Sequence, residues 1–204
     1  MRSAHVFLGL AVAATLAAFS LRVDAQAGAG PIGVASAKVT ITGTTNVHGY
    51  TASTATVRVS AVKTGAFDGD LWKLVERPAL VEAFAITIPS ASLHSTKDGI
   101  DKNMHKALKA TEFKDITFRI SSLEARGGDG ALRALGVLTI AGVSKDITLD
   151  LTAQRAGSNL SISGEIPLLM TDYGITPPKA MMGMMRTDPK IAIRVELVLA
   201  PSAS

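Results

Sequence analysis

The sequence predicts an all-β domain of about eight to ten strands, arranged as a sandwich or a closed barrel and accompanied by one short helix. Three observations favour this fold. Apolar and polar residues alternate along most of the chain after residue 37, which is the period of a half-buried strand. The alternating runs are joined mostly by short turns. Long helices do not recur between them, which disfavours a parallel α/β sheet and favours a sandwich or a barrel.

The first 25 residues have the features of a secretory signal peptide. Arg2 provides a positive start, and an apolar run of about 13 residues follows, which is short for a membrane span. Small residues surround a cleavage position between Ala25 and Ala27. We therefore expect a bacterial protein that is periplasmic or secreted and has no stable membrane insertion after cleavage, with an uncleaved anchor as the alternative. The expected organisation is a signal peptide at 1–25, a flexible leader at 26–37 and one domain at 38–200.

The composition excludes several classes of protein. The chain contains no cysteine, so it has no disulfide, no thiol chemistry and no cysteine metal site. A disulfide-free exported chain suits a bacterial periplasm, where disulfides are permitted but not required. The formal net charge of +4 is small, and the sequence contains no long run of basic residues, so nucleic acid is not an expected partner.

Strands are expected wherever the alternation is sustained. The clearest lies at 189–201, where Ile191, Ile193 and Val195 share one face and Arg194 and Glu196 share the other. Within 132–154 two alternating runs flank a polar turn of five residues, 142–146, which predicts a hairpin. The remaining strands are expected at 38–42, 55–63, 79–88, 115–123 and 158–169.

One segment has a helical period instead. Ile100, Met104 and Leu108 recur at helical spacing, which predicts a helix over 100–110 that lies across one end of the sheet. Asp98 or Asp101 is the expected N-terminal cap, because short acidic side chains accept hydrogen bonds from the free amides there.

Four motifs resemble the YceI-like family. They are Asn46-Val47-His48-Gly49-Tyr50, the block from Ser95 to Phe118 that ends in MHKALKATEFKDITF, the hairpin GVLTIAGVSKDITLDL, and Asp172-Tyr173-Gly174-Ile175 followed by Thr-Pro-Pro. Lys114 stands where the family often has proline. The resemblance covers about 38–199. It implies a lipocalin-like antiparallel β-barrel, and some members of the family hold a polyisoprenoid chain inside that barrel.

The resemblance and the alternation together predict that an apolar ligand, a polyisoprenoid by resemblance, is carried or sequestered inside the barrel. Burial of several hundred Å² of hydrocarbon at about 25 cal/mol per Å² offers on the order of 10 kcal/mol before ordering costs, so retention needs no chemistry. The candidate ligand-binding residues are chosen from the apolar face of the predicted strands, from the methionine run and from the helix. Lys102 and Asn103, on the helix, are assigned to a head group. The nominated residues are Phe84, Ile86, Phe118, Ile120, Leu138, Met181, Met185, Ile193, Val195, Lys102 and Asn103.

No catalytic set is predicted. The sequence has no GxSxG nucleophile elbow, no HExxH motif and no carboxylate cluster. We therefore expect no enzyme activity, no catalytic residue, no metal ligand and no cofactor apart from a bound isoprenoid or quinone-like lipid.

The segment TPPKAMMGMMRTDP, at 176–189, contains four methionines and allows three interpretations. They plug the core at one end of the barrel, they form a pliable wall at the cavity mouth, or they bind a soft ion such as Cu(I) in a periplasmic copper-handling protein. A further alternative for the whole chain is a ligand-free structural or stress-related interaction module with a packed barrel. The oligomeric state stays open, a homodimer included.

Overall fold

The computed structural model describes residues 32–201 of the 204-residue chain, apart from the side chains of Ala180 and Met181. The predicted signal peptide lies outside the described residues. The strands are β1 Ile32–Thr45, β2 Gly49–Thr54, β3 Arg58–Thr64, β4 Val81–Pro89, β5 His94–Ser95, β6 Asp115–Ala125, β7 Ala131–Ile140, β8 Val143–Ala156, β9 Asn159–Leu169, β10 Lys179–Ala180 and β11 Met185–Pro201. The helices are α1 Lys73–Glu76 and α2 Asp98–Ala107, with 3-10 turns η1 Pro78–Leu80, η2 Ser90–Ser92, η3 Met170–Tyr173 and η4 Met181–Gly183.

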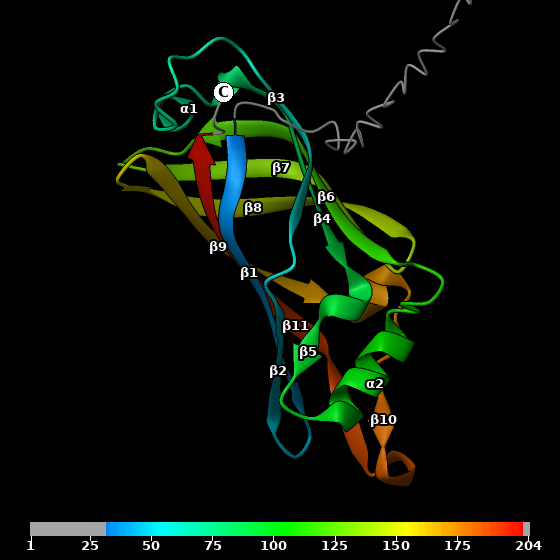
Figure 1. Cartoon of the computed structure of the whole chain (residues 1–204). Coiled ribbons are helices and arrows are strands. Elements are labelled where there is room, and N and C mark those ends of the chain that lie inside the picture. Colours follow the sequence, from blue (N-terminus) through cyan, green and yellow to red (C-terminus); the bar gives the residue numbers. More distant parts are fainter. Residues whose placement is uncertain (1–31, 202–204) are drawn as a thin grey trace, which may run out of the picture.

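The strands form one antiparallel sheet in the order β3-β4-β6-β7-β8-β9-β11-β1-β2-β5, with β10 paired to β11. The sheet curls around an apolar interior (Figure 1). Consecutive strands β2 and β3 pair with different neighbours, β2 with β1 and β3 with β4, so the chain itself crosses the seam of the barrel. The prediction of an all-β, lipocalin-like antiparallel fold is confirmed. The alternation does not predict β2, β5 and β10, because each is short.

Helices and turns cover the two ends of the curled sheet (Figure 1). Helix α1 and its flanking loops lie at one end, where Leu71, Leu74 and Val75 are buried against Leu132 and Leu199. Helix α2 lies at the other end, as the sequence predicts, and packs Met104 and Ala107 against the core cluster there. The core is thus divided into two apolar clusters, one toward each end of the barrel.

Three bulges change the phase that simple alternation predicts. Ser60, Glu82 and Ser121 are each skipped in the pairing with the neighbouring strand. A bulge places two residues opposite one, so side chains beyond it change face. Ala61 is consequently exposed and Glu82 points outward, where it pairs with Lys63. Strict alternation along 55–63 and 79–88 would place Ala61 and Glu82 on the apolar face, and the bulges turn both outward.

The β7–β8 turn is tighter than predicted. It contains two residues, Ala141 and Gly142, whose φ angles of 48° and 80° are both positive. Two central residues with positive φ match the twist of a β-hairpin, and this geometry allows the shortest connection. The predicted five-residue turn at 142–146 is corrected, because Val143 to Asp146 pair with β7 as part of β8.

The domain begins earlier than residue 38. Ile32 is only 5% exposed and belongs to the core cluster near α1. The segment from Ile32 to Ala37 pairs with the last residues of β11. Its small residues carry no alternation, so pairing with β11, rather than local pattern, makes it a strand. The prediction of a flexible leader is therefore wrong for residues 32–37, and residues 26–31 lie outside the described part of the chain.

The start of α2 also differs from the prediction. The N-cap residue is Lys97, and its side chain makes no capping hydrogen bond. The carboxylate of Asp101 turns back instead, accepting from Ser95 N at 2.7 Å and lying 3.0 Å from Nδ1 of His94. Asp101 therefore ties the first turn of α2 to β5, and neither predicted aspartate caps the helix by its side chain.

A pair of glycine substitutions tests the packing of this fold. A Cβ at Gly136 on β7 would lie 2.3 Å from the carbonyl oxygen of Arg119 and 2.7 Å from the ring of Phe118. We expect Gly136→Ala to lower the free energy of unfolding by about 1–3 kcal/mol, because the ring and the strand must move. Gly99→Ala on exposed α2 meets nothing within 4 Å and should raise it by about 0.5 kcal/mol. Urea unfolding measures both, and equal effects at the two positions would contradict this packing.

Candidate functional site

The interior of the curled sheet contains a cavity of about 260 Å³. Its wall is predominantly apolar and extends from Leu74 and Leu199 near α1 to Met170 and Met185 at the other end. Inward side chains in the middle, such as Ile193, are only half-buried, although they face away from solvent. Their residual exposed surface borders the cavity, so the barrel is hollow along its axis rather than filled by its own side chains.

The structure places most of the nominated ligand-binding residues on this wall. Asn103 from α2 also borders the cavity. Lys102, its neighbour, is exposed and is not part of the lining, so the two do not converge on one head group. The side chain of Met181 lies outside the described residues. Those that line the cavity are Phe84, Ile86, Asn103, Phe118, Ile120, Leu138, Met185, Ile193 and Val195, and their contact with a ligand stays a prediction.

The methionine run does not form a plug in the core. Met182 is 98% exposed and Met184 is 70% exposed, whereas Met185 is half-buried and borders the cavity. The backbone explains the outward direction, since Met182 and Gly183 have φ angles of 54° and 89° and turn the chain sharply. The core-plug interpretation is therefore wrong for Met182 and Met184. Among the described residues, no group of three or more His, Asp or Glu side chains is arranged to hold a metal ion.

Polar side chains border the cavity mainly at the end near α2. Tyr50, His48, Lys179 and Tyr173 reach this part of the wall. The sequence pattern does not single out Tyr50, Lys179 or Tyr173 for the cavity, because they lie in turns and short strands without alternation. The family motifs that contain Tyr50 and Tyr173 were the available signal. Nδ1 of His48 lies 3.1 Å from the carbonyl oxygen of Gly49, a local contact within the turn.

Tyr173 has an unusual environment. Its side chain is 3% exposed, and its hydroxyl is the one buried side-chain polar atom within the described chain that has no hydrogen-bond partner. Burial raises the pKa of this phenol, with a smaller effect of Asp172, so the hydroxyl keeps its proton at neutral pH. A buried donor without a partner costs free energy. Tyr173 therefore borders the cavity and carries a buried hydrogen-bond donor that has no partner.

Two histidines near the cavity mouth have structural partners. His94 contacts Asp101, and Nε2 of His105 lies 2.8 Å from the carbonyl oxygen of Leu93. Their rings meet edge to face with centroids 5.8 Å apart. These contacts fasten α2 to the segment that follows β4. The histidines thus position the helix at the mouth, and neither is among the residues that line the cavity.

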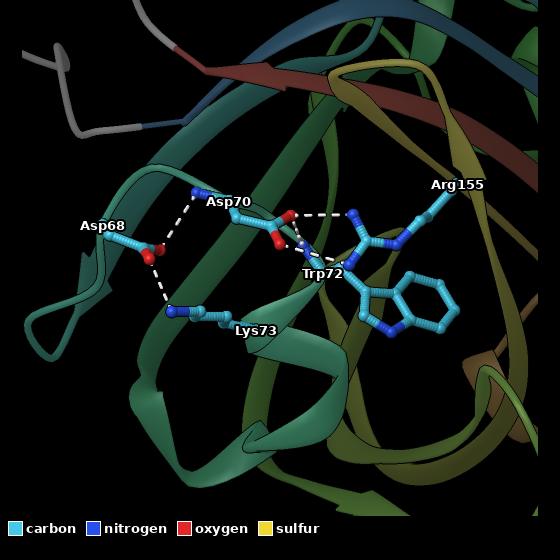
Figure 2. A network of polar contacts seen from close by, with 5 residues as sticks. All are labelled: Asp68, Asp70, Trp72, Lys73 and Arg155. Carbon is cyan, nitrogen blue, oxygen red and sulfur yellow. Dashed lines mark hydrogen bonds and ion pairs between the residues drawn. The ribbon is translucent and has the colours of Figure 1, made fainter.

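The opposite end of the barrel is closed by a polar network around α1 (Figure 2). Arg155, in β8 just before the β8–β9 turn, donates two hydrogen bonds of 3.1 Å to the carboxylate of Asp70, and its guanidinium lies over the ring of Trp72 at 5.1 Å. These hydrogen bonds hold the pKa of Asp70 below its usual range. Lys73 pairs with Asp68 beside them. The network fastens α1 over the apolar residues Leu74 and Val75, so this end of the cavity is covered.

Comparisons with known proteins agree with this architecture. A family model described as the YceI-like domain matches residues 32–199. Among solved structures, BcnA of Burkholderia cenocepacia has a TM-score of 0.63 and 18% identity, covering 79% of this chain and 95% of that chain. A polyisoprenoid binding domain from Saccharophagus degradans has a TM-score of 0.63 and 11% identity, covering 84% and 99%. The YceI protein of Campylobacter jejuni has a TM-score of 0.53 and 20% identity, covering 73% and 85%.

At such low identities, the structural similarity shows a shared fold alone. Among curated proteins, none matches the sequence. Within the part of the chain that the structure describes, no helix combines the length and apolar character needed to cross a bilayer.

The Asp101 contacts predict a pH dependence of stability. Hydrogen bonds from Ser95, with a smaller effect of His94, lower the pKa of Asp101 from its ordinary value of 3.8. Because the pKa is lower in the folded state, the ionised carboxylate stabilises the folded protein above about pH 3.8. This stabilisation is lost as the pH falls through the lowered pKa. We expect Asp101→Asn to be less stable than the parent protein at neutral pH, with a difference that shrinks on acidification.

Urea unfolding of both proteins across this range measures the difference. Asp98→Asn is the matched control, because Asp98 is an exposed carboxylate in the first turn of the same helix. A stability gap for Asp101→Asn that persists unchanged at acidic pH would contradict this account of the contact.

Proposed function

The chain belongs to the YceI-like domain family, and from that premise we propose that it binds an apolar, isoprenoid-type molecule inside its barrel. The protein carries or sequesters this molecule without transforming it, and it acts after export to the bacterial periplasm or beyond. The observation that carries the proposal is the continuous apolar cavity, which runs between the two ends of the sheet and is bordered by half-buried aliphatic side chains. A slim hydrocarbon chain suits such a space, because it buries apolar surface on all sides.

The polyisoprenoid binding domain of Saccharophagus degradans supports this choice of ligand class, since its fold is shared with this chain. A ligand-free module with a packed barrel is less well supported, because its inward side chains would have no reason to remain half-buried. A copper-handling function has no specific support from the arrangement of Met182 and Met184, which are turned to solvent.

Tyr173 supports a ligand that also carries a neutral oxygen atom. Its unpartnered hydroxyl donates one hydrogen bond, which a carbonyl or ether oxygen accepts. Lys179 is the single Lys, Arg, Asp or Glu among the described lining residues, so the wall offers little compensation for the several charges of a pyrophosphate. A quinone-like isoprenoid therefore fits the wall better than an isoprenyl pyrophosphate.

Filling the cavity tests whether the ligand lies in the barrel. We expect Ile193→Trp to lower the free energy of unfolding by less than about 1.5 kcal/mol, since the indole grows into free space instead of overpacking a full core. The same variant should lose most of its capacity for a geranylgeranyl-bearing quinone. Ser163→Trp, on the exposed face of β9, is the matched control and should keep that capacity.

Equilibrium unfolding and native mass spectrometry after loading measure the two effects. Unchanged loading of Ile193→Trp would place the ligand elsewhere. A loss of stability well above 1.5 kcal/mol in the same variant, a limit set roughly by tolerated core substitutions, would instead indicate a packed interior.

Removing one oxygen atom tests the role of Tyr173. We expect Tyr173→Phe to bind the geranylgeranyl quinone about fivefold more weakly, which corresponds to one neutral hydrogen bond of about 1 kcal/mol. Its affinity for squalene, a hydrocarbon without oxygen, should stay unchanged or rise. The ligand-free variant should be at least as stable as the parent, because a buried unpaired hydroxyl is gone.

Competition for a fluorescent fatty probe measures both affinities under the same conditions. If quinone and squalene lose affinity equally in Tyr173→Phe, the hydroxyl acts through packing and the proposed hydrogen bond is absent.

A further inference from the structure

The large apolar side chains that the described part of the chain exposes are gathered at the cavity-mouth end. They are four, and three of them lie on two neighbouring turns: Val47 is 65% exposed, Met182 98% and Met184 70%. The fourth, Leu169, is 43% exposed at the end of β9 and borders the cavity. We call Val47, Met182 and Met184 the apolar tip. Solvent-exposed apolar side chains that cluster in this way mark a surface that contacts another apolar phase.

The apolar tip is held by hydrogen bonds between its two turns. The Asn46 amide donates to the carbonyl oxygen of Met184 at 2.9 Å, and its oxygen accepts from Arg186 N at 2.8 Å. Thr45 Oγ1 accepts from the backbone amides of Val47 and His48. The β1–β2 turn and the turn before β11 therefore project together from the lower end of the molecule (Figure 1). The exposure of the three side chains is a consequence of this fixed backbone.

The apolar tip is continuous with the cavity. Met185, which follows Met184 in β11, borders the cavity, and so does Lys179, which pairs with Arg186 across β10 and β11. Thr45 and Thr187 pair across β1 and β11 and also border it. A molecule that leaves the barrel at this end therefore emerges beside Met184 and Val47.

The charges around the apolar tip are mainly positive. Lys179, Arg186 and Lys190 are exposed on β10 and β11, and Asp188 is the single acidic residue between them, so the segment 179–190 has a net charge of 3 − 1 = +2. Anionic lipid head groups attract such cations, and apolar side chains that project beyond them enter the interface. A second copy of this chain would instead bring like charges together. The projecting shape also favours a deformable lipid phase over a broad protein face.

We propose that the apolar tip docks on an anionic lipid bilayer, with Val47, Met182 and Met184 buried among the head groups and the cavity mouth facing the membrane. This inference rests on the proposed function, because the docking would serve to transfer the apolar ligand between the bilayer and the barrel. The docking is peripheral and reversible, since three apolar side chains and a few cations make a shallow contact.

Flotation of the mature chain with vesicles tests the docking. Vesicles of phosphatidylcholine and phosphatidylglycerol in equal amounts should bind the protein, and binding should weaken in high salt and with phosphatidylcholine alone. We expect Met182→Ser with Met184→Ser to bind at least about tenfold more weakly, because two apolar anchors are lost. Met182→Leu with Met184→Leu should bind as well as the parent, since it keeps the apolar surface and removes the sulfur atoms.

A second pair of variants tests the charge. Lys190→Gln should weaken binding by about fivefold, whereas Arg126→Gln should leave it nearly unchanged, because Arg126 lies in the exposed β6–β7 turn near the α1 end. Unfolding curves of the exposed-site variants should match the parent, which separates docking from folding.

The proposal is overturned if the parent protein fails to bind the anionic vesicles, or if the double serine variant binds equally well. It is also overturned if sedimentation shows that the parent protein is a dimer and the serine variant a monomer, because the apolar tip would then contact a second copy. If the leucine variant loses binding as the serine variant does, the sulfur atoms bind a thiophilic ion and the proposal is overturned as well. These vesicles contain no isoprenoid, so the result is independent of ligand binding. Quinone uptake from detergent micelles without vesicle docking would refute the docking alone, and docking without uptake would refute the proposed function alone.

Discussion

The interior of this protein depends on one constraint: a sheet that curls must line its hollow with alternate side chains, and here those side chains are too small to fill it. Aromatic residues make up 4% of the chain, and the inward positions are mostly Ile, Leu and Val. Branched aliphatic side chains cover the wall without reaching the axis. The consequence is a wall whose apolar surface remains partly uncovered, as Ile193 and Phe118 illustrate. Covering this surface with hydrocarbon lowers the free energy of the protein and its ligand.

The two ends of the hollow differ in chemistry. At the α1 end, the hydrogen bonds between Arg155 and Asp70 fasten an apolar cover whose residues Leu71 and Leu74 are almost fully buried. At the α2 end, the wall becomes polar through residues such as Tyr173 and Lys179, and the neighbouring turns expose methionines. A ligand with one polar end and a long apolar tail would suit this gradient, with the polar end toward Tyr173 and the tail toward Leu74.

The strand pattern in the sequence predicts the wall better than the mouth. Phe84, Ile86 and Phe118 lie on the cavity because alternation holds over the stretches that contain them. Strict alternation gives the wrong face beyond Ser60 and at Glu82, since bulges there depend on pairing between strands. At the mouth, Lys102 and Asn103 are adjacent in sequence but only Asn103 reaches the cavity, because a helix turns successive side chains by about 100°.

The order of apolar and polar residues by itself determined that this chain forms β-strands with one apolar face and a helix near one end, and the family motifs implied that these strands form a barrel. That information is local, since the period of a strand or a helix is set by its own backbone geometry. Only the tertiary structure decided that Ile32 belongs to the sheet, that Met182 and Met184 face outward, and that Tyr173 is buried without a partner. Each of these depends on residues far away in the sequence, β11 for the first and Asn46 for the second, so no local pattern could reveal them.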